Sequence, residues 1–164
     1  MKIPSALQNP QSPLFCLALL RMMIGLMFLT TWASNLLKGF YTPDGLQIFL
    51  TQVLPQSQNP LTWYAAFINT VILPSRGVFA PFQLIAEFGL GLALLVGVFT
   101  PVFSLAGIFF LLNTFLATFG HDWPWAYAMP VGILGVCFLA RAGRSVGLDA
   151  YLRQRFGEPR LPWW

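Results

Sequence analysis

The chain has 164 residues, of which 57% are hydrophobic and only 9% are charged. A soluble domain carries about 25% charged residues, so this composition excludes an ordinary water-soluble globular protein and predicts one integral membrane domain over residues 1–164. The net charge of +4 does not indicate a nucleic-acid partner, because five of the nine basic residues lie at positions 141–160, as they would at the flank of a membrane span.

The first apolar segment covers residues 14–37 and is interrupted by Arg21 and a few small polar groups. Roughly 20 residues are needed to cross the hydrocarbon core, so this segment is the predicted first transmembrane helix. Its length and the position of Arg21 argue against a cleaved signal peptide.

Residues 38–80 form the predicted outer loop between the first and second spans. The sequence Thr42-Pro43-Asp44 indicates a helix start with proline in the first turn. The following stripe predicts a helix that lies on the membrane surface: Leu46, Phe49, Leu50 and Val53. Residues 61–73 are apolar but too short to span, which predicts an interfacial or re-entrant segment.

Three further spans are predicted at residues 81–99, 101–119 and 124–140. Their connections are short, which forces neighbouring helices to be antiparallel. Small residues at positions 89, 93 and 97 recur every four residues in the second span and predict a flat strip for close helix packing. The predicted fold is therefore all-α: an integral membrane four-helix antiparallel bundle, with interfacial helices in the first outer loop and in the C-terminal tail.

Basic residues set the predicted orientation. Lys2 and the five arginines of residues 141–164 would share one side of the membrane, against Lys38 and Arg76 on the other, which places the N-terminus and the C-terminus in the cytoplasm. The predicted location is a bacterial or archaeal inner membrane, with a thylakoid membrane as an alternative. One face of the tail predicts a surface helix (Leu148, Tyr151, Leu152 and Phe156), and the final residues 161–164 predict an interfacial anchor.

Glu87 is the most informative polar residue, because a lone carboxylate within a span costs a few kcal/mol and should face the bundle. Helix directions bring five further residues to the same outer half: Trp32, Asn35, Lys38, Asn113 and His121. One interpretation is a quinone site, in which Glu87 and His121 handle protons and the other four residues position the quinone. The other is a pair between Glu87 and Lys38 or Asn113 that only locks the bundle, with His121 as an ordinary loop histidine.

Arg21, Arg144 and Asp149 are predicted to be structural polar residues. Arg21 would extend its guanidinium to the cytoplasmic interface or pair with Asp149. A single histidine excludes a bis-histidine haem, and no residues have metal-ligand spacing. The sequence therefore predicts quinone as a substrate and no metal or haem ligated by this chain.

Three groups of residues carry a family resemblance. They are Arg21, Gly25, Phe28 and Lys38 in the first span, Glu87, Gly91, Gly97 and Thr100 around the second, and the sequence GRSVGLDAYL at residues 143–152. Over about residues 14–155 the chain resembles the DoxX/DoxD family, most closely the DoxD large subunit of thiosulfate:quinone oxidoreductase. The resemblance implies a membrane subunit that helps to oxidise thiosulfate to tetrathionate and passes electrons to quinone, together with other subunits in the lipid membrane.

The alternative is a non-catalytic accessory or scaffold subunit of a larger respiratory or photosynthetic membrane complex. Whether the chain is itself an enzyme is therefore left open between these two hypotheses. A small solute transporter is less favoured, because the sequence has no inverted repeat with broken helices in matching positions.

Overall fold

The computed structural model describes residues 13–157, so the predicted anchor at residues 161–164 lies outside the described part. Four long helices dominate this part: α2 (Pro13–Leu37), α5 (Arg76–Val96), α6 (Thr100–Ala117) and α7 (Trp125–Ala140). The shorter helices are α3 (Pro43–Ile48), η1 (Phe49–Val53), η2 (Gln56–Gln58), α4 (Thr62–Phe67), η3 (Ile68–Ile72), η4 (Ala142–Arg144) and α8 (Leu148–Phe156). Among the described residues every regular element is helical, which confirms the predicted all-α class.

Three of the long helices, α2, α5 and α6, are long and apolar enough to cross a membrane, as expected of an integral membrane protein. Helix α7 has 16 residues, or about 24 Å at 1.5 Å per residue, and is shorter than the hydrocarbon core of roughly 30 Å. The four-span topology therefore stays a prediction. Helix α5 begins at Arg76, five residues before the predicted start, and Pro81 lies inside it.

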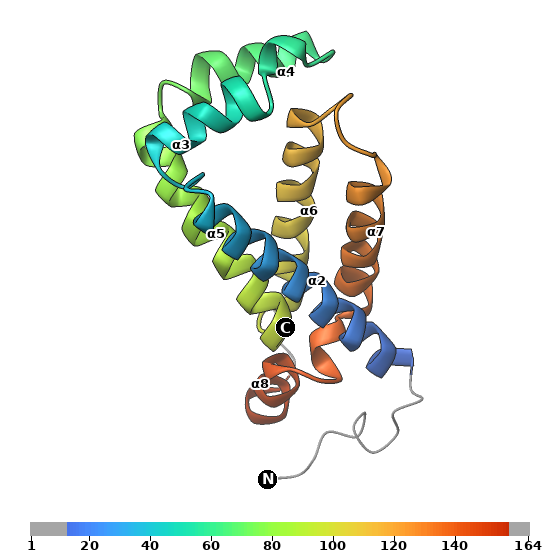
Figure 1. Ribbon diagram of the computed structural model, residues 1–164. Helices are drawn as coiled ribbons and strands as arrows, with labels where there is room; N and C mark the ends of the chain where they lie inside the picture. The colour runs from blue at the N-terminus through green and yellow to red at the C-terminus, as the bar shows by residue number, and fades with distance from the viewer. Residues whose placement is uncertain (1–12, 158–164) are drawn as a thin grey trace.

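The segment between α2 and α5 folds into a helical hairpin, α3–η1 followed by α4–η3. Figure 1 shows this hairpin across the end of the bundle where α2 ends, while α8 lies at the opposite end. The predicted helix start is confirmed, since α3 begins at Pro43 and the Thr42 hydroxyl accepts a hydrogen bond from Gly45 N at 3.0 Å. Within the predicted stripe, Leu46 and Leu50 are buried in the protein whereas Val53 is 57% exposed, and the π-helical turn η1 interrupts the 3.6-residue period of the stripe.

Helices α2 and α5 pack closely through two glycines. A Cβ at Gly25 would lie 2.5 Å from Leu95 N, and one at Gly91 would lie 2.8 Å from the Leu29 side chain. Such contact between backbones is the main attraction between helices in lipid, where burial of apolar area is not a driving force. The prediction for Gly89 is wrong: no atom lies within 4 Å of a Cβ built there, because the contact face runs through Gly91.

The interior consists of two clusters of buried apolar side chains. One fills the bundle and contains Ile24, Phe28, Leu90, Leu94, Leu111 and Leu134. The other lies beneath the hairpin and contains Leu46, Leu50, Tyr64, Ile68, Ile72 and Ala80. The polar groups that concern function lie between these two clusters, at the hairpin end of the bundle.

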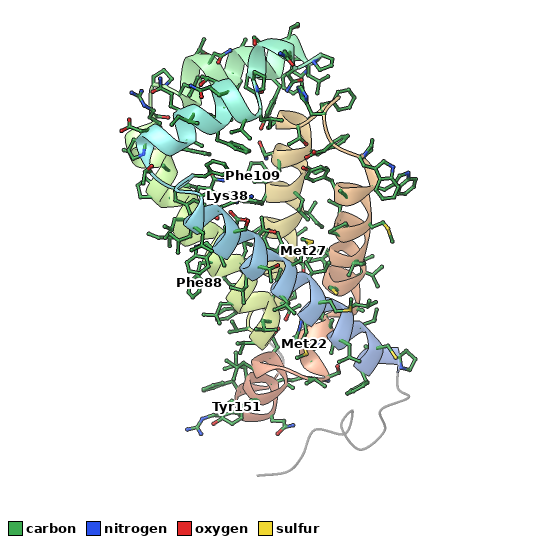
Figure 2. All side chains as sticks on the ribbon, viewed as in Figure 1. Met22, Met27, Lys38, Phe88, Phe109 and Tyr151 are labelled. Carbon is green, nitrogen blue, oxygen red and sulfur yellow. The ribbon has the colours of Figure 1, made fainter. Side chains whose placement is uncertain are left out.

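Helix α8 contacts the bundle through Asp149 and Ala150, which are buried. Leu148, Tyr151 and Phe156, on the predicted surface face, are 45–66% exposed, and Figure 2 shows Tyr151 at this end of the molecule. This exposure fits a surface helix, but contact of α8 or of the hairpin with the membrane surface stays a prediction.

Candidate functional site

Glu87 is 1% exposed and lies on the face of α5 that packs against α2. Because Gly91 follows it by one turn on the same face, the close approach of the two helices brings the carboxylate to side chains near the end of α2. The carboxylate is hydrogen-bonded to the Asn35 side chain and accepts a hydrogen bond from the Tyr41 hydroxyl at 2.5 Å. A buried acid needs such partners, since each unmet hydrogen bond to a charged group is costly at this depth.

Tyr41 was missed by the sequence reasoning, although it is the shortest contact of Glu87. Gly39 has φ +74°, a left-handed conformation that lets the chain turn back after α2 and brings Tyr41 over α5. Burial and the hydrogen bond to Glu87 raise the pKa of Tyr41 above its ordinary value, so the hydroxyl stays protonated. The sequence offered one signal: Tyr41 lies four residues after the end of the first span, and the acid Glu87 on the next span needs a hydrogen-bond donor.

A cavity of about 250 Å³ adjoins Glu87 on the interior side. Five aromatic residues line its wall, namely Phe28, Phe40, Phe49, Phe110 and Tyr127, together with polar and aliphatic side chains. The remaining lining residues are Met27, Thr31, Asn35, Leu46, Gln83, Leu111, Thr114 and Ala126. We call this space the head cavity.

A second cavity of about 190 Å³ lies under the hairpin and is more apolar. We call it the tail cavity. It shares five lining residues with the head cavity, so the two spaces adjoin: Leu46, Phe49, Gln83, Phe110 and Thr114. Asn113 lines its far side and is held there by the Tyr64 hydroxyl, which lies 3.1 Å from Asn113 Oδ1. Figure 2 labels Met27 of the head cavity and Phe109 of the tail cavity.

Gln83 is a further residue that the sequence reasoning missed. It lies one turn before Glu87 on the same face of α5 and lines both cavities at their junction. Within residues 13–157 no hydrogen bond of its side-chain amide is found, so the amide is available to a molecule in either cavity. Its spacing of four from Glu87 was the signal in the sequence.

Three of the predicted site residues lie elsewhere. Lys38 is exposed, with Nζ 5.9 Å from the centre of the Phe40 ring, and in the described part of the chain it makes no ion pair with Glu87. The Trp32 ring packs on Phe88 at 4.9 Å, outside both cavities, and His121 is exposed in the turn after α6. Each step of three residues along an α-helix turns the side-chain direction by 60°. Trp32, Asn35 and Lys38 therefore point in different directions.

A second tyrosine–carboxylate pair touches the head cavity from α7. The Tyr127 hydroxyl donates to Asp122 Oδ2 at 2.6 Å, and Tyr127 lines the cavity. Asp122 itself is exposed in the turn between α6 and α7. The head cavity therefore contacts two such pairs, one buried on α5 and one that reaches the surface.

The structural polar residues gather at the α8 end. Asp149 is fully buried and accepts hydrogen bonds from the Phe99 and Thr100 amides at 2.7 and 2.8 Å, so that it caps α6 from another helix. Burial raises the pKa of Asp149 more than these bonds and the nearby Arg21 charge lower it. Arg21 is 1% exposed and donates to Val146 O at 2.7 Å instead of extending to the interface.

Glycines make room for this arrangement. A Cβ at Gly97, which has φ +74°, would collide with the Arg21 guanidinium, and one at Gly143 would collide with the Asp149 carboxylate. Arg144 is half-buried in η4, next to Gly143. The ending at residues 143–152, on which the family resemblance mainly depends, thus serves to dock the tail on Arg21 and on the start of α6.

One comparison with known proteins identifies a relationship. A family model described as "TQO small subunit DoxD" matches residues 16–163 of the chain, where TQO stands for thiosulfate:quinone oxidoreductase. No curated protein and no solved structure matches. The match agrees with the resemblance to DoxD, whereas the expected large subunit is not confirmed, because the description names the small one.

Proposed function

Because the chain belongs to the DoxD family, we propose that it is a membrane subunit of a thiosulfate:quinone oxidoreductase-like system and that its own cavities bind the quinone. The observation that carries this proposal is a buried acid, Glu87, on the wall of an aromatic cavity that continues into an apolar one. A lipid quinone has the same division, with a planar ring that bears two oxygens and a long hydrocarbon tail.

In this proposal the quinone ring occupies the head cavity and packs against Phe28, Phe49 and Phe110. Glu87 is a catalytic acid, because its carboxyl group lines this cavity and can carry a transferable proton. Tyr41 and Asn35 are positioning residues that hold the carboxyl in place by hydrogen bonds. Gln83, at the junction, would donate to a ring oxygen, and the tail would extend into the tail cavity.

Thiosulfate itself does not suit these cavities. It is a dianion, and the described walls present an acid and aromatic rings but no arginine or lysine side chain. An anion would lose its hydration there without a compensating positive charge. The sulfur donor is therefore oxidised elsewhere, on a partner subunit, and this chain receives the electrons at the quinone.

The test is Glu87→Gln, measured as thiosulfate-dependent quinone reduction in membranes that contain the assembled protein. Glutamine keeps the size and a hydrogen-bonding carbonyl but carries no transferable proton, so we expect the rate to fall by about 10²-fold. The matched control is Asp44→Asn, which neutralises an exposed carboxylate in the first turn of α3 and should leave the rate unchanged.

A wild-type rate in Glu87→Gln membranes would refute the role of Glu87. The accessory function gains support from a different result, in which the purified wild-type chain binds no quinone although it copurifies in a stoichiometric complex. Quinone affinity of the purified chain is therefore measured alongside the rate.

A further inference from the structure

The head cavity has a second proton-bearing group on a different helix from Glu87. Tyr127 lies on α7, and Figure 1 shows α5 and α7 on different sides of the bundle, with α6 between them. The Tyr127 ring is held by Phe115, with ring centres 5.7 Å apart, and its hydroxyl donates to Asp122 at 2.6 Å. Both tyrosine and glutamate line the same cavity of about 250 Å³.

The two pairs differ in their access to water. Glu87 and Tyr41 are both buried, at 1% and 6% exposure, so a proton spent there is not replaced directly from solvent. Asp122 is exposed, so it can exchange protons with water at the hairpin end. Tyr127 bridges the two environments, since its ring lines the cavity while its hydroxyl bonds an exposed carboxylate.

Quinone reduction requires two protons as well as two electrons. We infer that Tyr127 protonates one quinone oxygen while Glu87 protonates the other, and that Asp122 conducts the replacement proton from water to Tyr127. This inference rests on the proposed function. It assigns Tyr127 as a catalytic residue and Asp122 as a proton entry from the surface, which the buried Glu87–Tyr41 pair does not provide.

The balance of the step is complete. Two thiosulfate ions join through a new S–S bond to form tetrathionate and release two electrons. The quinone accepts these electrons, its two C=O groups become C–O bonds, and two O–H bonds form with the protons of Glu87 and Tyr127. A proton then passes from water through Asp122 to the Tyr127 oxygen, and a second proton from water returns to the Glu87 carboxylate before the next turnover.

The groups around Tyr127 are few. The Thr118 side chain from α6 is hydrogen-bonded to the Tyr127 hydroxyl, His121 precedes Asp122 in the turn, and Glu87 lines the same cavity from α5. Within residues 13–157 no lysine or arginine forms an ion pair with Asp122. The pH dependence of quinone reduction is therefore attributed to Asp122 or to His121 by substituting each residue separately.

The experiment uses Asp122→Asn in membranes that contain the assembled protein, with thiosulfate as donor and a decyl-substituted benzoquinone as acceptor. Asp122 is exposed, so the variant should fold normally. We expect the rate to fall about tenfold near neutral pH, with a larger solvent deuterium isotope effect and partial recovery as the pH is lowered. Quinone affinity should stay within about twofold, because Asp122 does not line the cavity.

Tyr127→Phe keeps the ring and removes the transferable proton, so its rate should fall further, by about 10²-fold. Asp44→Asn again serves as the control, and His121→Ala should retain the wild-type pH profile. The inference is overturned if Asp122→Asn and Tyr127→Phe both keep the wild-type rate and isotope effect while Glu87→Gln does not, a result that leaves the proposed function intact. Membranes in which the wild-type protein reduces no quinone overturn both.

Discussion

The docking of the C-terminal segment, residues 143–152, on the bundle gives the sharpest prediction for stability. Asp149→Ala removes the carboxylate that caps α6, and leaves the buried Thr100 amide without an acceptor and the Phe99 amide with only partial access to water. A buried donor left unsatisfied costs about 1–3 kcal/mol. The variant also removes the electrostatic attraction that Asp149 exerts on the buried Arg21 charge, although no ion pair joins these two side chains in the described part of the chain.

Because the pKa of Asp149 is raised by burial, part of its population is neutral as the pH falls, and its attraction to Arg21 weakens accordingly. Because two backbone amides lose their acceptor, we expect Asp149→Ala to lower the free energy of unfolding by about 3 kcal/mol. Asp149→Asn keeps the side-chain size and one carbonyl acceptor, so its loss should be smaller.

The assay is unfolding in detergent micelles by titration with a denaturing detergent, followed by circular dichroism. Asp44→Ala is the matched control, because it removes an exposed acid from a helix first turn, where the expected loss is at most about 1 kcal/mol. If Asp149→Ala unfolds within about 0.5 kcal/mol of the wild-type protein, then Asp149 does not anchor the tail, and the reasoning about residues 143–152 is refuted.

Two further predictions concern packing and alkaline stability. Gly25→Val should cost about 1–3 kcal/mol, because its Cβ would lie 2.5 Å from Leu95 N, whereas Gly89→Ala, with open space around it, should leave the thermal midpoint in detergent nearly unchanged. Tyr41 has a folded-state pKa above its unfolded value of about 10, so its contribution to stability is complete below that pH and is lost as the pH rises toward the folded-state value. Above about pH 10, the thermal unfolding midpoint of Tyr41→Phe should therefore fall less steeply with pH than that of the wild-type protein. Equal slopes for the two proteins would contradict this role of Tyr41.

The sequence alone predicted the helical class and the positions of the long helices, because hydrophobic runs in lipid have to be helices of a fixed minimum length. It also predicted that Glu87 would face inward, since a membrane-embedded acid has few other options. The start of α3 followed from local chemistry at Thr42 and Pro43, which needs no tertiary contact.

Side-chain partners depended on the tertiary structure. Lys38 was a reasonable partner for Glu87 from topology, but the helical rotation between residues 35 and 38 turns Lys38 away, and the turn at Gly39 brings Tyr41 in its place. Helix directions give the height of a residue in the membrane, whereas the rotation of each helix and the path of each loop decide what it touches.

What the sequence determined by itself is therefore the set of long helices and the need for a partner at Glu87, both of which follow from the cost of polar groups in lipid. Only the tertiary structure decided that Tyr41 and Asn35 are those partners, that Asp149 caps α6, and that two adjoining cavities lie at the hairpin end of the bundle. These outcomes depend on contacts between segments far apart in the chain, such as the backbone approach at Gly25 and Gly91, and no local pattern in the sequence specifies their geometry.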